Sequence, residues 1–171
     1  MGDSWFERNV YSLKSFMRIA FGVVWLIDGI LKFRLTPSAF SSMITTVGEG
    51  QPGWMLPWFS FWSRAVTVNP ALFLYVVAVS ETLLGLALIL GAVRKPAYLA
   101  GIALSLLIWS VPEGFGGPYG PGSTDIGTGI IYAFVFIFLL IVNAGYGPSR
   151  LSVDYFIEKK YPKWRRVAET G

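Results

Sequence analysis

The sequence predicts an all-α integral membrane protein: a bundle of four transmembrane helices with a short interfacial or re-entrant helix in its first outer loop. Composition and patterning support this class. Of the 171 residues, 54% are hydrophobic and only 14% are charged, whereas soluble domains carry about 25% charged residues. The charges gather at the edges of long apolar runs. Runs of this length suit the hydrocarbon core of a bilayer, which is about 30 Å thick.

Four apolar runs mark the predicted spans, at about 16–33, 71–93, 97–111 and 126–142. Asp28 interrupts the first run and no small-residue cleavage site follows it, so we interpret this run as an uncleaved span and not as a signal peptide. Glycine and proline residues end the fourth run. We therefore expect a membrane domain over residues 1–155 and a basic cytoplasmic tail over residues 156–171.

Two loops between the spans have unusual compositions. Residues 36–69 are too apolar for a plain loop, and Trp54, Trp58 and Trp62 recur every four residues, which places them on one helical face. This segment is expected to form the short interfacial or re-entrant helix, with its tryptophans at the membrane interface or lining a pocket. Residues 112–125 are rich in glycine and proline, which favours an irregular structure.

The distribution of lysine and arginine predicts the orientation, because cytoplasmic segments carry the excess of these bases. One side of the spans has eleven of them: Arg8, Lys14, Arg18, Arg94, Lys95, Arg150, Lys159, Lys160, Lys163, Arg165 and Arg166. The other side has only Lys32, Arg34 and Arg64. Both termini are therefore expected in the cytoplasm and the protein in the plasma membrane. Topology and anionic lipid explain the net charge of +4, so no nucleic-acid partner is expected.

The chain contains no cysteine and no histidine. This composition excludes thiolate nucleophiles, iron–sulfur clusters, zinc–cysteine sites, and haem held by histidine or cysteine. We expect no metal site and no covalently bound cofactor. If the protein handles electrons, an organic carrier or a partner subunit must supply the redox centre.

Ionisable residues inside the spans are the first candidates for chemistry. Glu81 lies in the middle of the second run, where it is either a proton-handling or ligand-binding carboxyl or a polar link between helices. Asp28 and Lys32 lie one turn apart, so they either pair with each other or place Asp28 beside Glu81. Lys32, Arg34 and Arg64 are placed to attract an anionic substrate to the outer face, although Arg64 also suits an anchor for an interfacial helix.

The second group of candidates flanks the glycine-rich loop. Glu113 has Trp109, Phe115 and Tyr119 around it, and Asp125 is also placed to cap the last span. An aromatic, glycine-rich loop with two acids either closes over a flat ring ligand or forms a rigid cap. From position and chemistry, we assign catalytic roles to Glu81, Asp28 and Glu113. Binding of substrate or quinone is assigned to Lys32, Arg34, Arg64, Trp109, Phe115, Tyr119 and Asp125.

Three stretches resemble the DoxX family of four-helix membrane proteins. Residues 18–33 (RIAFGVVWLIDGILKF) look like the first helix of that family, and residues 81–91, which begin ETLLG, look like its second. The loop WSVPEGFGGPY, followed by TDIG at 124–127, is similar to the DoxD branch. The resemblance covers about residues 16–155, and the loop is its most specific part.

The resemblance implies a subunit of a membrane thiosulfate:quinone oxidoreductase. That enzyme couples two thiosulfates into tetrathionate, passes two electrons to a membrane quinone, and works with a smaller DoxA-like subunit. It is associated with a terminal quinol oxidase. Two alternatives stay open: a non-catalytic accessory subunit of a terminal quinol oxidase, and a small-molecule carrier that uses Glu81 as a proton relay.

Overall fold

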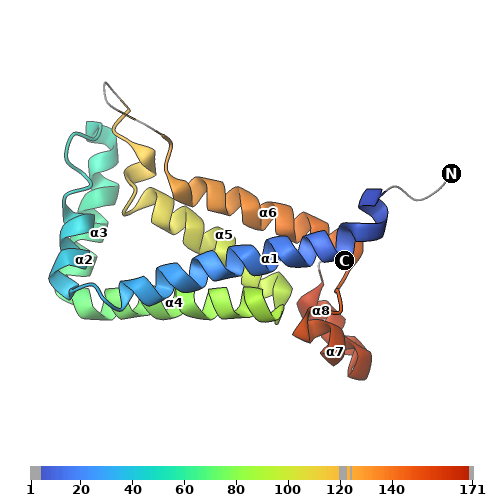
Figure 1. Cartoon of the computed structure of the whole chain (residues 1–171). Helices are drawn as coiled ribbons and strands as arrows, with labels where there is room; N and C mark the ends of the chain where they lie inside the picture. The colour runs from blue at the N-terminus through green and yellow to red at the C-terminus, as the bar shows by residue number, and fades with distance from the viewer. Residues whose placement is uncertain (1–4, 120–122, 124, 170–171) are drawn as a thin grey trace.

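The computed structural model describes residues 5–119, 123 and 125–169, and the regular elements among them are all helices. Four long helices run side by side in alternating directions: α1 (Trp5–Lys32), α4 (Pro70–Leu90), α5 (Arg94–Ser110) and α6 (Thr128–Tyr146) (Figure 1). The short helices α2 and α3 lie at one end of this bundle, which we name the loop end. Helices α7 and α8 lie at the opposite end, the tail end, together with the beginning of α1 (Figure 1).

Three helices in the described part of the chain are long and apolar enough to cross a membrane. They cover Asn9–Lys32 in α1, Pro70–Leu90 in α4 and Thr128–Tyr146 in α6. Helix α5 has 17 residues, fewer than the roughly 20 that usually span a bilayer. The predicted membrane protein and three of its spans are thus supported, and the fourth span stays a prediction.

The helix ends differ from the edges of the apolar runs because capping, and not hydrophobicity, determines where a helix begins and ends. Helix α1 begins at Trp5, before the apolar run at 16. Helix α4 ends at Leu90, since Gly91 takes the left-handed conformation (φ 65°) that closes many helices. Helix α6 runs from Thr128 to Tyr146, so it is shifted toward the tail relative to the predicted span at 126–142.

Glycines join the long helices into two tight pairs, α1 with α4 and α5 with α6. A Cβ atom on Gly85 of α4 would lie 2.5 Å from the backbone nitrogen of Leu26, and one on Gly29 of α1 would lie 2.6 Å from that of Thr82. In the second pair, Gly101 packs directly against the ring of Phe136. Small residues of this kind let membrane helices approach closely.

An aromatic layer fills the bundle between the two pairs. Phe21 and Trp25 of α1 meet Phe136 of α6 at ring-centroid distances of 4.9 Å and 5.5 Å. Tyr98 of α5 is buried in the same cluster, and Leu88 and Leu139 complete it. This layer separates the tail end from the half of the bundle nearest the loop end.

The segment between α1 and α4 contains more structure than the single short helix predicted for it. It forms α2 (Pro37–Thr45), the 3₁₀ turn η1 (Gly53–Met55) and α3 (Leu56–Val68). Trp58 donates a hydrogen bond to the carbonyl of Ser110 (2.9 Å), which ties α3 to the end of α5. Trp54 lies in η1 and is largely exposed, so the three tryptophans do not form one continuous face.

The residues after α6 fold back onto the tail end of the bundle. They form α7 (Val153–Lys160), the 3₁₀ turn η3 (Pro162–Trp164) and α8 (Arg165–Ala168). The boundary predicted between the membrane domain and the tail, after residue 155, lies within α7. Buried Asp154 accepts hydrogen bonds from the backbone nitrogens of Val93 (2.9 Å) and Arg94 (3.0 Å), so it caps α5. The predicted basic tail is therefore packed against the helices.

Candidate functional site

A polar cavity of about 270 Å³ lies in the half of the bundle nearest the loop end. All four long helices contribute to its wall, and Glu113 closes it from the loop that follows α5. Its ionisable lining residues are Asp28, Lys32, Glu81 and Glu113. The sequence-based candidates Asp28, Glu81 and Glu113 are thus brought to one place from three separate segments, together with Lys32.

Glu81 forms an ion pair with Lys32, with 2.7 Å between Oε2 and Nζ. The glutamate is only 1% exposed, whereas Lys32 is about one quarter exposed. The pair forms because Gly29 lets α4 approach the backbone of α1 next to Lys32. Asp28 is half-buried, lines the cavity, and forms no ion pair with any described residue. Lys32 therefore neutralises the acid of the neighbouring helix and not the one on its own helix.

Glu113 has a structural role as well as a place in the cavity. Its two carboxylate oxygens accept hydrogen bonds from the Thr128 hydroxyl (2.5 Å) and the Gly129 amide (2.9 Å). These donors belong to the first turn of α6, whose N-cap residue Gly127 offers no side chain. Glu113 thus caps α6 from a distance. Asp125, the predicted cap, accepts a hydrogen bond from Gly127 (2.7 Å), just before the helix begins.

Apart from Glu81 Oε2, which is ion-paired with Lys32, two buried hydrogen-bonding groups in the cavity wall lack a hydrogen-bond partner among the described residues. They are the indole Nε1 of Trp25, which is 1% exposed, and the hydroxyl of Ser105, which is 0% exposed. Leaving such a group unsatisfied costs roughly 1–3 kcal/mol, so most buried polar groups are hydrogen-bonded. Sequence reasoning missed both residues. The only signal was that each interrupts an otherwise apolar stretch with a group able to donate.

The aromatic candidates form a layer above the cavity and do not line it. The Trp109 indole donates a hydrogen bond to the carbonyl of Ile126 (2.7 Å), and its ring packs edge-on against Phe115 at 5.1 Å between centroids. Phe115 lies in η2 (Gly114–Gly116) with a φ of 59°, unusual for a residue with a side chain. The Tyr119 hydroxyl bonds to the carbonyl of Phe115, while its ring is mostly exposed.

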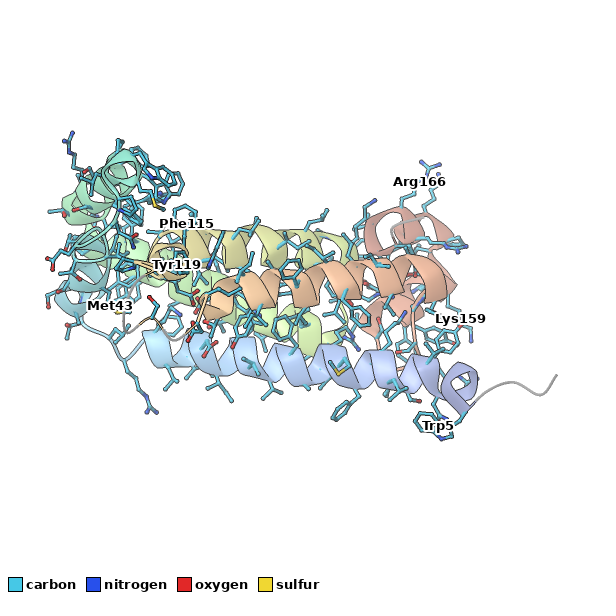
Figure 2. All side chains as sticks on the ribbon, turned by 90° about the horizontal axis from the view of Figure 1, so that it is seen from above. Trp5, Met43, Phe115, Tyr119, Lys159 and Arg166 are labelled. Carbon is cyan, nitrogen blue, oxygen red and sulfur yellow. The ribbon has the colours of Figure 1, made fainter. Side chains whose placement is uncertain are left out.

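The outer bases do not gather at the cavity. Arg34 and Arg64 are both exposed at the loop end, and Arg64 borders a shallow hollow on α3. Among the described residues that line the polar cavity, Lys32 is the only base. Figure 2 shows Met43, Phe115 and Tyr119 together at the loop end, with Lys159 and Arg166 at the tail end.

The described part of the chain is a helical bundle with helices apolar enough for a lipid bilayer. Inside the bundle lies a cavity lined by three carboxyl groups and by two donors without a hydrogen-bond partner. No family model, curated protein or solved structure matches the chain. The resemblance to the DoxD branch therefore stays a prediction.

Proposed function

We propose that this chain is the DoxD-type membrane subunit of a thiosulfate:quinone oxidoreductase, and that its polar cavity binds the head of a membrane quinone. One observation carries the proposal: the cavity combines carboxyl groups with the partnerless donors Trp25 Nε1 and Ser105 Oγ. A quinone has two carbonyl oxygens that accept hydrogen bonds, and its reduction consumes protons. The cavity offers hydrogen-bond donors for the carbonyl oxygens and carboxyl groups that can supply the protons.

The proposed reaction balances without a metal. An S–S bond forms between two thiosulfate anions, which releases two electrons and gives tetrathionate. The two electrons and two protons convert the quinone to its hydroquinone. Trp25 and Ser105 hold one carbonyl oxygen of the ring, and Asp28 passes on the two protons in turn, one to each oxygen of the developing hydroquinone. The ion pair with Lys32 holds the Glu81 carboxyl at the cavity wall beside Asp28.

Thiosulfate binds outside this cavity in our proposal. Three carboxyl groups and one ammonium line the chamber, and a dianion is repelled by the excess negative charge. Arg34 and Arg64, exposed at the loop end, offer an anion site on the surface. A DoxA-like small subunit docked there would complete the thiosulfate site and supply the redox centre that passes the two electrons to the quinone. A terminal quinol oxidase would then consume the hydroquinone.

The proposed topology has four spans with both termini in the cytoplasm of a cell bounded by this membrane. Helix α4 ends at the tail end and α6 begins at the loop end, so α5 must cross the whole bundle to connect them (Figure 1). The chain has no native cysteine, so single cysteines at Ala92 and Ser123 give a clean test. A membrane-impermeant thiol reagent added to intact cells should label position 123 and not position 92. The opposite pattern would invert the topology.

Two observations weigh against the alternative functions. An accessory subunit of an oxidase would be expected to pack solidly around Glu81, yet Glu81 borders a cavity. A carrier needs a polar route from Glu81 to both membrane faces. The aromatic layer of Phe21, Trp25, Tyr98 and Phe136 fills the bundle on the side of the tail end.

The test measures thiosulfate-dependent reduction of ubiquinone-1 by the purified complex, together with equilibrium binding of ubiquinone-1. Ser105→Ala and Trp25→Phe each remove one donor, so binding should weaken roughly two- to tenfold. Asp28→Asn should lower kcat and leave binding nearly unchanged. The matched control is Ser80→Ala, on α4 but outside the cavity wall. Wild-type behaviour of all three cavity variants, or no binding to the wild type, would overturn the proposal.

A further inference from the structure

A second pocket, of about 260 Å³, lies beside the polar cavity and has a different character. Helices α2 and α3 form its outer wall, and α4 and α5 form its inner wall. Its lining is almost entirely apolar and includes Phe40, Met43, Trp62, Val77 and Leu107. The segment between the first two long helices thus folds back to enclose a hydrophobic space.

The two pockets adjoin each other. Lys32, Ile108 and Glu113 line both of them, so the same three side chains form the partition. Lys32 suits this position, because its ammonium pairs with Glu81 while a lysine stem covers apolar surface well. Only these three side chains therefore stand between a ligand in the polar cavity and the apolar pocket.

The apolar pocket also reaches the outer surface of the bundle. Met43 of α2 is 52% exposed and Leu107 of α5 is 37% exposed, and both line the pocket. Exposed apolar residues on a membrane helix face the lipid chains. The pocket therefore has an exposed apolar border at Met43 and Leu107, which we name its mouth.

We propose that the two pockets form one site for a lipid-soluble ligand with a polar ring and a long prenyl tail, which enters sideways between α2 and α5. The ring occupies the polar cavity and the tail leaves through the apolar pocket. This inference rests on the proposed quinone function and adds the site of the prenyl tail and the side from which the ligand enters. The reasoning is geometric, since a tail attached to a ring inside the bundle must have an exit, and the apolar pocket adjoins the cavity.

The experiment compares two probes on the purified full-length chain in detergent: ubiquinone-4, with four isoprene units, and ubiquinone-0, with none. Binding is measured by quenching of tryptophan fluorescence. Val77→Phe narrows the apolar pocket, and Val76→Phe, on the exposed face of the same helix, is the matched control. We expect Val77→Phe to weaken the binding of ubiquinone-4 about tenfold or more, and the binding of ubiquinone-0 less than about twofold. Val76→Phe should change neither.

A second variant guards against misfolding of the first. Met43→Phe changes the exposed mouth, where a larger side chain is accommodated without repacking the core, and it adds no fluorophore that would alter the tryptophan signal. It should reproduce the selective loss of ubiquinone-4 binding. Equal losses for both probes, or no loss for ubiquinone-4, would overturn the two-part site while leaving the quinone function standing. Failure of the wild type to bind ubiquinone-0 would instead count against the quinone function, and the two-part site would fall with it.

Discussion

Arginine 94 holds the C-terminal helices on the bundle, and its removal should have a large effect on stability. Its guanidinium is buried and contacts three acids: Asp154 (3.0 Å), Glu158 (2.9 Å) and Glu169 (3.0 Å). It also donates to the side chain of Asn143 (2.7 Å). The variant Arg94→Ala leaves a group of buried carboxylates without a counter-charge.

The size of the effect follows from what each acid keeps. Asp154 retains hydrogen bonds from Val93, from the backbone of residue 94 and from the Trp164 indole (2.9 Å), so its charge stays partly compensated. Glu158 and Glu169 both lose the Nη2 donor of Arg94. Breaking a buried ion pair from one side costs about 3–5 kcal/mol. The unfolded population should therefore rise by roughly two to four powers of ten.

The assay is denaturant unfolding of the full chain in detergent, with limited proteolysis of the tail as a second measurement. Lys159→Ala, an exposed base of α7, serves as the matched control and should change the free energy of unfolding by less than about 0.5 kcal/mol. The loss in free energy of unfolding for Arg94→Lys should lie between those of Arg94→Ala and Lys159→Ala, because an ammonium keeps the charge but cannot reach all partners at once. A loss below about 1 kcal/mol in Arg94→Ala, or equal proteolysis of variant and control, would refute the reasoning.

Three further predictions concern the cap of α6, the contact between α1 and α4, and Glu158 of α7. Glu113→Gln should lower the free energy of unfolding by about 1–2 kcal/mol, because an amide keeps only one acceptor for two donors. Gly85→Leu should cost about 3 kcal/mol or more, since even its Cβ would lie 2.5 Å from the Leu26 nitrogen. Burial, and then the nearby Glu169, raise the pKa of Glu158 above its ordinary value. The folded state therefore loses stability as pH rises from the ordinary glutamate pKa, about 4, through the raised pKa of Glu158. Across that window the stability of Glu158→Gln should increase relative to that of the wild type.

Each of these three predictions is checked by unfolding titrations of variant and wild type. For Glu113→Gln, unchanged stability would mean that α6 has no need of this cap. For Gly85→Leu, the comparison is Leu86→Ala on the exposed face of α4, and similar small losses in both would contradict the close contact. For Glu158→Gln, a constant difference across the pH range, or one that moves in favour of the wild type, would show that the pKa is not raised.

The apolar runs predicted where the long helices lie, because a span must be apolar along its whole length. They could not predict the partners of each polar residue. Asp28 and Lys32 have the spacing of a pair within one helix, yet Lys32 contacts Glu81, because Gly29 and Gly85 bring the second helix close enough to compete. The choice depends on the distance between helices, which sequence periodicity does not contain.

The same limit explains why the structural roles of Trp25, Ser105 and Arg94 were not predicted from the sequence. Trp25 and Ser105 look like ordinary members of apolar spans, and their importance arises only from which face of each helix meets the cavity. Arg94 was predicted only as a base on the cytoplasmic side of the spans, which stays a prediction; its burial among acids that follow it by 60 residues or more was not foreseen. Contacts between such distant positions are not visible as a local motif.

The division of the long helices into two glycine-joined pairs has a mechanical consequence. Within each pair the backbones nearly touch, so sliding or tilting one helix against its mate would force atoms into overlap. Between the pairs, contacts are made by side chains, and the polar cavity lies along that seam. The bundle thus consists of two rigid helix pairs with a more deformable interface between them. We therefore expect any motion that admits a ligand to occur between the pairs, by rearrangement of side chains and not by displacement of one helix against its mate.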